Sequence, residues 1–301
     1  MPSPSHRATQ RLASHAALVL RIPSLAEIPW LVHGFSTRLG GVSEHPFRQR
    51  PAREMNLGPA SWDVAANVEE NRRRLLAALR AEGMRLAVQN QIHSDLIRSL
   101  SERSDLAGNA RGDGMITKRK GILLGILAAD CFPLLLVDVR QKVVGAFHCG
   151  WRGTVRRIAQ KGVGQMRQRY GCRPQDLRAA LGPGIRACCY RVGEDVAAEF
   201  ESQFHDAASL LRIDRPQKKF MNKHFALLRS EPWRGTPAIE GREIYLDLAE
   251  AIIRQLEAAG LCREQIHSCA LCTSCSPDLF FSHRRDAGRT GRMMGVIGIR
   301  S

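Results

Sequence analysis

Two uninterrupted apolar runs in the middle of the chain dominate its hydrophobic pattern. They cover residues 122–127 and 143–147 and predict strands that are buried on both faces. The first run leads into Asp130 and Cys131, and the second ends at His148. A buried strand holds such a residue rigidly while the end of the strand opens to a cleft. We therefore interpret these three residues as the centre of a functional site.

The other periodic segments alternate between helical and strand-like spacing. Apolar residues three or four positions apart predict helices, and short apolar stretches bounded by turn residues predict strands. We expect helices over residues 63–80, 158–170, 192–204 and 244–259, and strands over residues 30–35, 86–92, 177–181 and 266–273. Residues 279–300 predict a strand, an arginine-rich loop and a closing strand.

This alternation favours a single α/β domain in which mixed β-sheets are flanked by helices. The chain of 301 residues is long enough to bury such a core. Residues 1–22 are polar and basic without periodicity, so we expect a flexible N-terminal tail followed by a catalytic domain over residues 23–301. Prolines between residues 205 and 240 predict an insertion or a long connection.

The formal net charge of +16 comes mostly from scattered arginines. A strongly basic balance can indicate nucleic acid or a substrate that carries phosphate. No recognition motif with interleaved aromatic residues accompanies these arginines. We therefore favour a solvated basic surface that attracts anions nonspecifically, and we disfavour a nucleic-acid partner.

The cysteines do not follow the pattern of a secreted disulfide framework, and two of them, Cys188 and Cys189, are adjacent. The apolar stretch over residues 16–20 is too short for a signal peptide, and no run is long enough to span a bilayer. We expect a cytoplasmic protein with reduced thiols and no membrane partner.

His93, Cys131 and His148 offer one thiolate and two imidazoles. Three such ligands with a vacant fourth position suit a catalytic zinc ion, and they suit zinc better than magnesium or calcium. The same trio could also be a cysteine nucleophile with a histidine base. From spacing alone, a buried cysteine and two unrelated histidines is the simplest interpretation.

A second group of cysteines lies near the C-terminus. Its members, which could bind structural zinc or an iron–sulfur cluster, are Cys262, Cys269, Cys272 and Cys275. Cys269 and Cys272 lie in or at the end of a predicted strand, so their side chains need not converge. We therefore disfavour a metal at this group.

A series of motifs gives the chain a family resemblance. In order, they read HGFSTRLGGVS, QIH, GDGMIT, AADCFPLLLVD, AFHCGWRGT, LGPGIRACCYRVG and FFSHRRDAGRTGR. Over residues 32–299 the chain resembles the YfiH-like family, which was historically labelled multicopper polyphenol oxidoreductase or laccase. Its fold resembles that of cysteine hydrolases. Its members are regarded as zinc-dependent purine nucleoside phosphorylases that also deaminate adenosine.

The resemblance implies that His93, Cys131 and His148 sit together as metal ligands and catalytic residues. It also implies that Arg38 lines the substrate site. Some positions depart from the usual motifs without removing a ligand, namely Ser94, Cys149, Gly184, Arg186 and His283.

The implied substrates are phosphate and a purine nucleoside such as adenosine, inosine or methylthioadenosine. Phosphorolysis needs a bound phosphate, for which Arg38, Ser36 and Arg152 are the candidate ligands. The arginine-rich loop over residues 284–292 could also cover the site or contact phosphate, and it could equally be a solvated hairpin loop. Deamination needs a water activated by zinc and a proton shuttle. Asp130, next to a proposed ligand, is the candidate shuttle or a residue that orients the ligand.

Two other enzyme classes remain open. A copper-dependent polyphenol oxidase fits the older label, because a thiolate with two imidazoles also binds copper. However, laccase chemistry needs several coppers held by many histidines, and the chain has no His-x-His pair. A cysteine-dependent amidase or hydrolase acting on cell-wall precursors fits the fold. We favour zinc over copper, and the sequence is compatible with a monomer or a homodimer.

Overall fold

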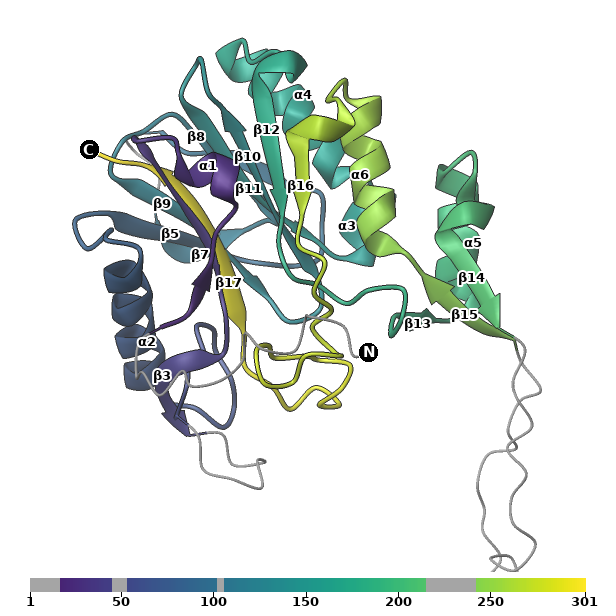
Figure 1. Ribbon diagram of the computed structural model, residues 1–301, viewed down its shortest axis with the longest axis horizontal. Helices are drawn as coiled ribbons and strands as arrows, with labels where there is room; N and C mark the ends of the chain where they lie inside the picture. Colours follow the sequence, from purple (N-terminus) through teal and green to yellow (C-terminus); the bar gives the residue numbers. More distant parts are fainter. Residues whose placement is uncertain (1–16, 45–52, 102–105, 215–241) are drawn as a thin grey trace, which may run out of the picture.

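Two six-stranded β-sheets pack face to face, and helices cover the outer face of each, which gives four layers (Figure 1). The computed structural model describes residues 17–44, 53–101, 106–214 and 242–301. The predicted α/β fold with mixed sheets flanked by helices is confirmed. Within the described ranges, no helix has the length and apolar character needed to cross a membrane.

Both large sheets are mixed. In the first, β17 is antiparallel to β2 and β9, whereas β5 is parallel to β9. Its order is β1 (Val19–Leu20), β2 (Leu31–Ser36), β17 (Met293–Ile299), β9 (Ile122–Ala128), β5 (Arg85–Asn90) and β7 (Ala107–Arg111). The order of the second is β16 (Ile266–Ser268), β12 (Leu177–Leu181), β10 (Phe132–Asp138), β11 (Val143–Cys149), β8 (Gly114–Thr117) and β6 (Ile97–Ser99).

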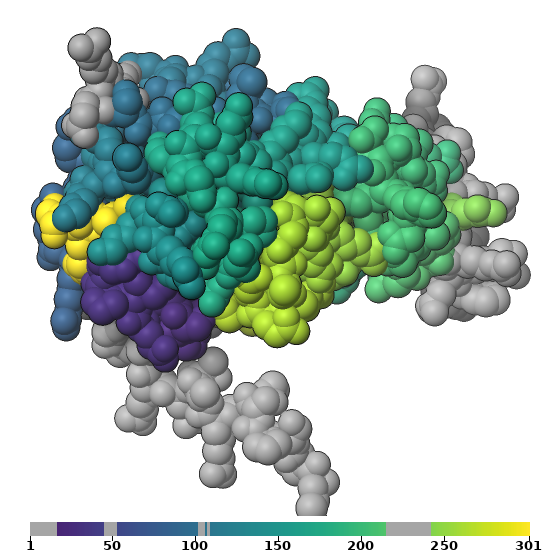
Figure 2. All heavy atoms as spheres, turned by 90° about the horizontal axis from the view of Figure 1, so that it is seen from above, coloured from purple at the N-terminus to yellow at the C-terminus, as the bar shows by residue number. Residues whose placement is uncertain are grey.

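Helices and two small sheets complete the fold. The helices are α1 (Pro23–Ala26), α2 (Ala65–Ala78), α3 (Trp151–Val155), α4 (Ile158–Tyr170), α5 (Glu194–Gln203) and α6 (Leu248–Ala258). The small sheets comprise β3 (Leu39–Glu44) with β4 (Arg53–Glu54), and β13 (Arg191–Val192), β15 (Glu243–Leu246) and β14 (Leu211–Asp214). The three-stranded sheet and α5 form a lobe at one end of the molecule (Figure 2).

Side chains alternate between two cores along the central strands. On β9, Leu124 lies in the core between the sheets, whereas Leu123 packs in the core that α2 covers. On β10, Leu135 faces the other sheet, and Leu134 lies in the core under α4 and α6. Because both faces of these strands are covered, both must be apolar. The prediction of strands buried on both faces is confirmed.

The predicted helices form, with one error at the start of the last. Its first residues belong to β15, where Ile244 and Leu246 are buried and Tyr245 between them is half-buried. This period of two is typical of a strand rather than a helix. Asp247 then accepts a hydrogen bond from the Glu250 amide at 3.0 Å and caps the start of α6.

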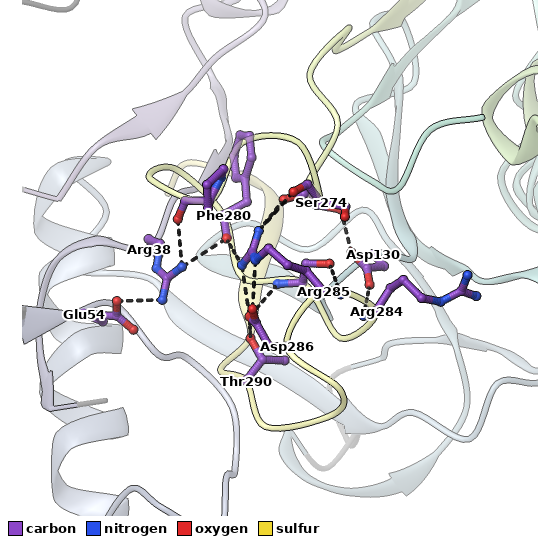
Figure 3. A network of polar contacts seen from close by, with 12 residues as sticks. Arg38, Glu54, Asp130, Ser274, Phe280, Arg284, Arg285, Asp286 and Thr290 are labelled. Atoms are coloured by element: carbon purple, nitrogen blue, oxygen red, sulfur yellow. Dashed lines mark hydrogen bonds and ion pairs between the residues drawn. The ribbon is translucent and has the colours of Figure 1, made fainter. Parts of the chain in front are cut away.

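The strand predictions near the C-terminus are partly confirmed, because two of the three predicted strands form. β16 stops at Ser268 instead of reaching residue 273, and β17 is the one strand formed over residues 279–300. The intervening loop buries Phe280 in a small apolar cluster of its own. The Arg285 guanidinium donates hydrogen bonds to the carbonyls of Phe280 at 3.0 Å and Thr273 at 2.9 Å, so these groups need no strand partner (Figure 3).

Part of the predicted tail is structured. Val19 and Leu20 form β1 and pair antiparallel with Ser36 and Phe35 of β2, because their apolar side chains have clusters to join at this edge. The rest of the tail, residues 1–16, and most of the predicted insertion, residues 215–241, lie outside the described residues. The division into a tail and a catalytic domain stays a prediction.

The chain crosses from one large sheet to the other at residues 129–131. β9 belongs to the first sheet and β10 to the second, so the link between them spans the two layers. The crossing leaves Asp130 and Cys131 at strand ends, beside the connections that leave β5 and β11. The functional site lies at this junction.

Candidate active site

Three connections bring His93, Cys131 and His148 together. His93 follows β5, Cys131 ends the link into β10, and His148 lies near the end of β11. The Cys131 sulfur and one ring nitrogen of each histidine all lie within 4.8 Å of one another. The antiparallel register sets Pro133 opposite His148, which brings Cys131 to the same end of the sheet. A Cβ atom at Gly150 would lie 2.9 Å from the Cys131 sulfur, so only glycine leaves room for the thiol.

The buried carboxylate of Asp113 organises the histidines. One of its oxygens lies 2.9 Å from Nδ1 of His148. The carboxylate also accepts the backbone N–H groups of Ile92, His93 and Ser94 at 3.2, 3.0 and 2.7 Å. The bond to Nδ1 leaves Nε2 of His148 available for a metal ion or for the Cys131 sulfur.

Two residues at the site have left-handed backbone conformations. His93 has φ = 57° and Asp130 has φ = 87°, values that cost a non-glycine residue about 1–3 kcal/mol each. The three amide bonds to Asp113 hold the loop of His93. The Asp130 carboxylate accepts the Thr273 hydroxyl at 2.6 Å and the Arg284 amide at 2.7 Å (Figure 3). Both strained residues are thus held by several hydrogen bonds.

The neighbouring groups shift the pKa values of Cys131 and His148. Burial by itself raises the pKa of the Cys131 thiol, but His148 and His93 outweigh it and lower the pKa to about 6. Burial by itself lowers the pKa of His148, but Cys131 and Asp113 outweigh it and raise the pKa to about 9. Without a metal ion, the favoured state near neutral pH is therefore a thiolate beside an imidazolium.

The trio opens into a cavity of about 800 Å³, a volume that suits a nucleoside-sized ligand. Three arginines, Arg72, Arg284 and Arg292, contribute to its lining. Among the described residues, none of the three forms an ion pair with a carboxylate. The cavity therefore favours an anionic ligand.

Gln89 supplies an unusual polar group to the same cavity. The residue is 5% exposed, and neither its amide oxygen nor its amide nitrogen has a hydrogen-bond partner within the described part of the chain. An unpaired buried amide costs about 1–3 kcal/mol. A ligand with both a donor and an acceptor on one edge would remove that cost.

Comparison with known proteins identifies the family. The family model described as multi-copper polyphenol oxidoreductase laccase matches residues 32–300. The chain belongs to this family. The resemblance to the YfiH-like family, predicted from the motifs, is thereby confirmed.

Individual members of the laccase family match along most of their length. The "Purine nucleoside phosphorylase" of Deinococcus radiodurans is 40% identical over 282 residues, which cover 93% of this chain and 92% of that protein. "Purine nucleoside phosphorylase YlmD" of Bacillus subtilis is 32% identical over 278 residues, covering 90% and 89%. The crystal structure of Bacillus licheniformis YfiH superimposes with a TM-score of 0.76 at 31% identity, covering 96% and 98%.

In this laccase-family chain, two of the predicted phosphate ligands point elsewhere. Arg38 is 4% exposed, forms an ion pair with Glu54 at 2.6 Å and donates to the Pro277 carbonyl at 2.8 Å (Figure 3). The Ser36 hydroxyl accepts the Met294 amide at 2.9 Å. Neither residue lines the cavity. The contacts of Arg38 instead join the turn after β2 to β4 and the C-terminal loop, and the contact of Ser36 joins β2 to β17.

The third predicted phosphate ligand, Arg152, is exposed on α3. Its guanidinium lies over the Trp151 ring at 4.5 Å and does not line the cavity. The Thr154 amide, in the same short helix, donates to the Gly150 carbonyl at 2.9 Å and is therefore not free for phosphate. Asp130 does line the cavity, but its carboxylate is engaged by the C-terminal loop, which favours an orienting role over a proton shuttle.

Sequence reasoning missed Asp113, Gln89 and Arg72, whereas the arginine-rich loop that it named as a possible phosphate contact supplies Arg284 and Arg292 to the cavity. Asp113 carried a usable signal, because it stands between Gly112 and Gly114 directly before a buried strand. A carboxylate in that place needs a buried cationic or N–H partner. Arg72 carried no such signal, since its sequence surroundings resemble those of the many surface arginines.

Replacing Asp113 tests whether its carboxylate orients the two histidines. Because the carboxylate orients a proposed metal ligand, we expect Asp113→Asn to weaken zinc affinity about 10- to 100-fold in chelator competition. Asp95→Asn is the control, since Asp95 pairs with Lys161 outside the cavity. Unchanged affinity in Asp113→Asn would contradict the orienting role.

The lowered pKa of Cys131 predicts reactivity at mildly acidic pH. In chelator-treated protein, we expect the alkylation rate of Cys131 to be high above pH 6 and to fall as the pH drops through about 6, because the thiolate is then protonated. Mass spectrometry of the alkylated peptides gives the rate at each pH. In His148→Gln the midpoint should move above about 8.5, the usual thiol value, since burial then dominates. A wild-type midpoint above pH 8 would contradict the thiolate–imidazolium pair.

Proposed function

We propose that this protein is a purine nucleoside phosphorylase. The observation that carries the proposal is one cavity that holds a His–Cys–His trio, unpaired arginines and an unpartnered amide. Arginines suit phosphate, and the amide of Gln89 suits the donor and acceptor edge of a purine. The names of the bacterial relatives point to the same activity.

In the proposed reaction, a phosphate oxygen bonds to the anomeric carbon of the ribose. The bond from that carbon to the purine nitrogen breaks, and its electron pair leaves with the base, which takes up a proton. Arg284 and Arg292 hold the phosphate and offset its charge, while Gln89 holds the base. The products are ribose 1-phosphate and a free purine, with adenosine, inosine and methylthioadenosine as the proposed substrates.

We also propose that the trio holds zinc and that the protein deaminates adenosine. One thiolate and two imidazoles, one of them oriented by Asp113, fit zinc with an open position. When bound, zinc supplies the Lewis acidity that activates water for attack on the purine ring. His93, Cys131 and His148 hold the ion, and Asp130 keeps the Cys131 loop in place. Zinc suits this set better than the several coppers of a laccase, since the trio offers three donors in one place.

A cysteine hydrolase is the second candidate, and one observation favours it. Cys131, His148 and Asp113 form the nucleophile, base and orienting carboxylate of a catalytic triad, with the thiolate favoured near neutral pH. This candidate needs no metal ion. Loss of activity on chelation therefore distinguishes the zinc-dependent deaminase from the cysteine hydrolase.

A cytoplasmic location is part of the proposal. All nine cysteines are free, which suits a reducing compartment. The proposed partners are small molecules, a purine nucleoside and phosphate, rather than a nucleic acid.

The direct test is incubation of the purified protein with adenosine and with inosine, with and without phosphate. We expect free base and ribose 1-phosphate only when phosphate is present, and inosine from adenosine without it. Cys131→Ala and chelation should each abolish deamination, whereas Cys262→Ala, at an exposed cysteine outside the cavity, should not. An activity that survives chelation and is lost on thiol alkylation would favour the hydrolase.

The proposed phosphate binding by Arg292 predicts that its loss weakens the affinity for phosphate. Losing a charge-assisted hydrogen bond costs about 1.5–3 kcal/mol, so Arg292→Gln should raise the KM for phosphate about 10- to 100-fold. Arg167→Gln, on the exposed face of α4, is the matched control.

Arg38→Gln should instead lower the free energy of unfolding by about 3–5 kcal/mol, because it leaves Glu54 buried without its ion pair. A raised KM in Arg38→Gln at unchanged stability would contradict this assignment.

A further inference from the structure

A second group of metal-ligating side chains lies outside the cavity. The sulfurs of Cys188, Cys189, Cys272 and Cys275 all lie within 4.8 Å of one another. Cys275 is 3.5 Å from Cys188 and 3.2 Å from Cys189, sulfur to sulfur. The group considered from sequence proximity, at which the sequence disfavours a metal, shares only Cys272 and Cys275 with this one. Cys262 and Cys269 lie apart, and the adjacent pair of the Cys-Cys-Tyr motif replaces them.

We propose that these four cysteines bind one zinc ion as a structural site. With zinc–sulfur bonds of about 2.3 Å, a tetrahedral ion keeps its sulfurs about 3.8 Å apart, and the observed separations of 3.2 Å, 3.5 Å and at most 4.8 Å lie around that value. A disulfide needs sulfurs about 2.05 Å apart, and every one of these cysteines is unbridged. An iron–sulfur cluster distributes its thiolates over several irons, which spaces them more widely than one shared ion does.

The backbone, rather than side-chain flexibility, brings the two cysteine pairs together. Gly184 and Cys272 form a parallel bridge, and the Thr273 amide donates to the Gly184 carbonyl at 3.1 Å. The Arg186 amide then points at the Cys272 sulfur at 3.4 Å, a donor that favours a thiolate. Cys272 and Cys275 have the Cys-x-x-Cys spacing common in structural zinc sites.

Two arginines lie beside this arrangement, and one of them, Arg285, also forms an ion pair with Asp286 at 2.8 Å. Four thiolates around one Zn²⁺ carry a net charge of −2, which nearby cations stabilise. The Arg285 side chain donates to the carbonyls of Thr273 at 2.9 Å and Ser274 at 3.5 Å, inside the turn between Cys272 and Cys275 (Figure 3). The Arg186 side chain donates to the carbonyl of Cys269.

Residues next to the proposed zinc site line the cavity or contact residues that line it. Tyr190, directly after the adjacent cysteines, lines the cavity, and Arg284 lies over its ring at 5.4 Å. Thr273, between the other two cysteines, donates to the carboxylate of Asp130, the neighbour of Cys131. A metal ion here would position these groups without touching the substrate. The proposal does not depend on which reaction the cavity carries out.

Metal analysis of the full-length protein expressed with zinc tests the proposal. We expect two zinc ions per chain in the wild type and in the control Cys262→Ser, and one in Cys131→Ala. Cys272→Ser should also retain one, and the double variant none. X-ray absorption at the zinc edge of Cys131→Ala should show a shell of sulfur alone, since the histidine-containing site is then lost.

Two results would overturn the proposal. One is a Cys131→Ala protein that folds, by circular dichroism, and retains no metal. The other is a disulfide from Cys275 to Cys188 or Cys189 in protein purified under reducing conditions. If Cys272→Ser fails to fold, the metal content and sulfur shell of Cys131→Ala still decide the matter. Failure of the proposed phosphorylase would leave both measurements unchanged, so the two proposals fail separately.

Discussion

The buried carboxylate of Asp113 is the interaction on which the site depends. It binds three consecutive amides of the loop after β5 and the imidazole of His148 on β11, so one charged group ties the first sheet to the second. Those donors replace the water that a buried carboxylate loses, and they lower its pKa to about 2 despite burial. The left-handed backbone of His93 persists because the same bonds hold it.

Crossing between the sheets is the second constraint. Cys131 meets the histidines because the chain leaves one sheet and enters the other at that point, and Asp130 absorbs the sharp turn with an unfavourable φ. The long C-terminal loop compensates by giving Asp130 two donors, and it supplies Arg284 and Arg292 to the cavity. The same loop carries half of the cysteine group that we propose as a zinc site.

The side chains that line the cavity can be compared with the two activities that the family description and the relatives' names suggest. The family description speaks of copper and polyphenols, whereas the bacterial relatives are called purine nucleoside phosphorylases. A phenol is largely apolar and neutral, and a cavity built for it would not need unpaired arginines beside a buried, unpartnered amide. Phosphate and a purine use both features.

The sequence by itself determined most of the elements and singled out the central trio of the cavity. Apolar runs predicted the strands buried on both faces, helical spacing predicted α4 with its observed bounds, and the motifs singled out His93, Cys131 and His148. Burial along one element leaves a local period, which a sequence displays directly. The role of Asp113 and the grouping of Cys188 and Cys189 with Cys272 and Cys275 needed the tertiary structure. Cys188 and Cys275 are 87 positions apart, and sheet register and backbone bridges rather than any local pattern bring them together. Arginines that face a cavity and arginines that face water look alike in sequence, because the difference lies in what packs around them.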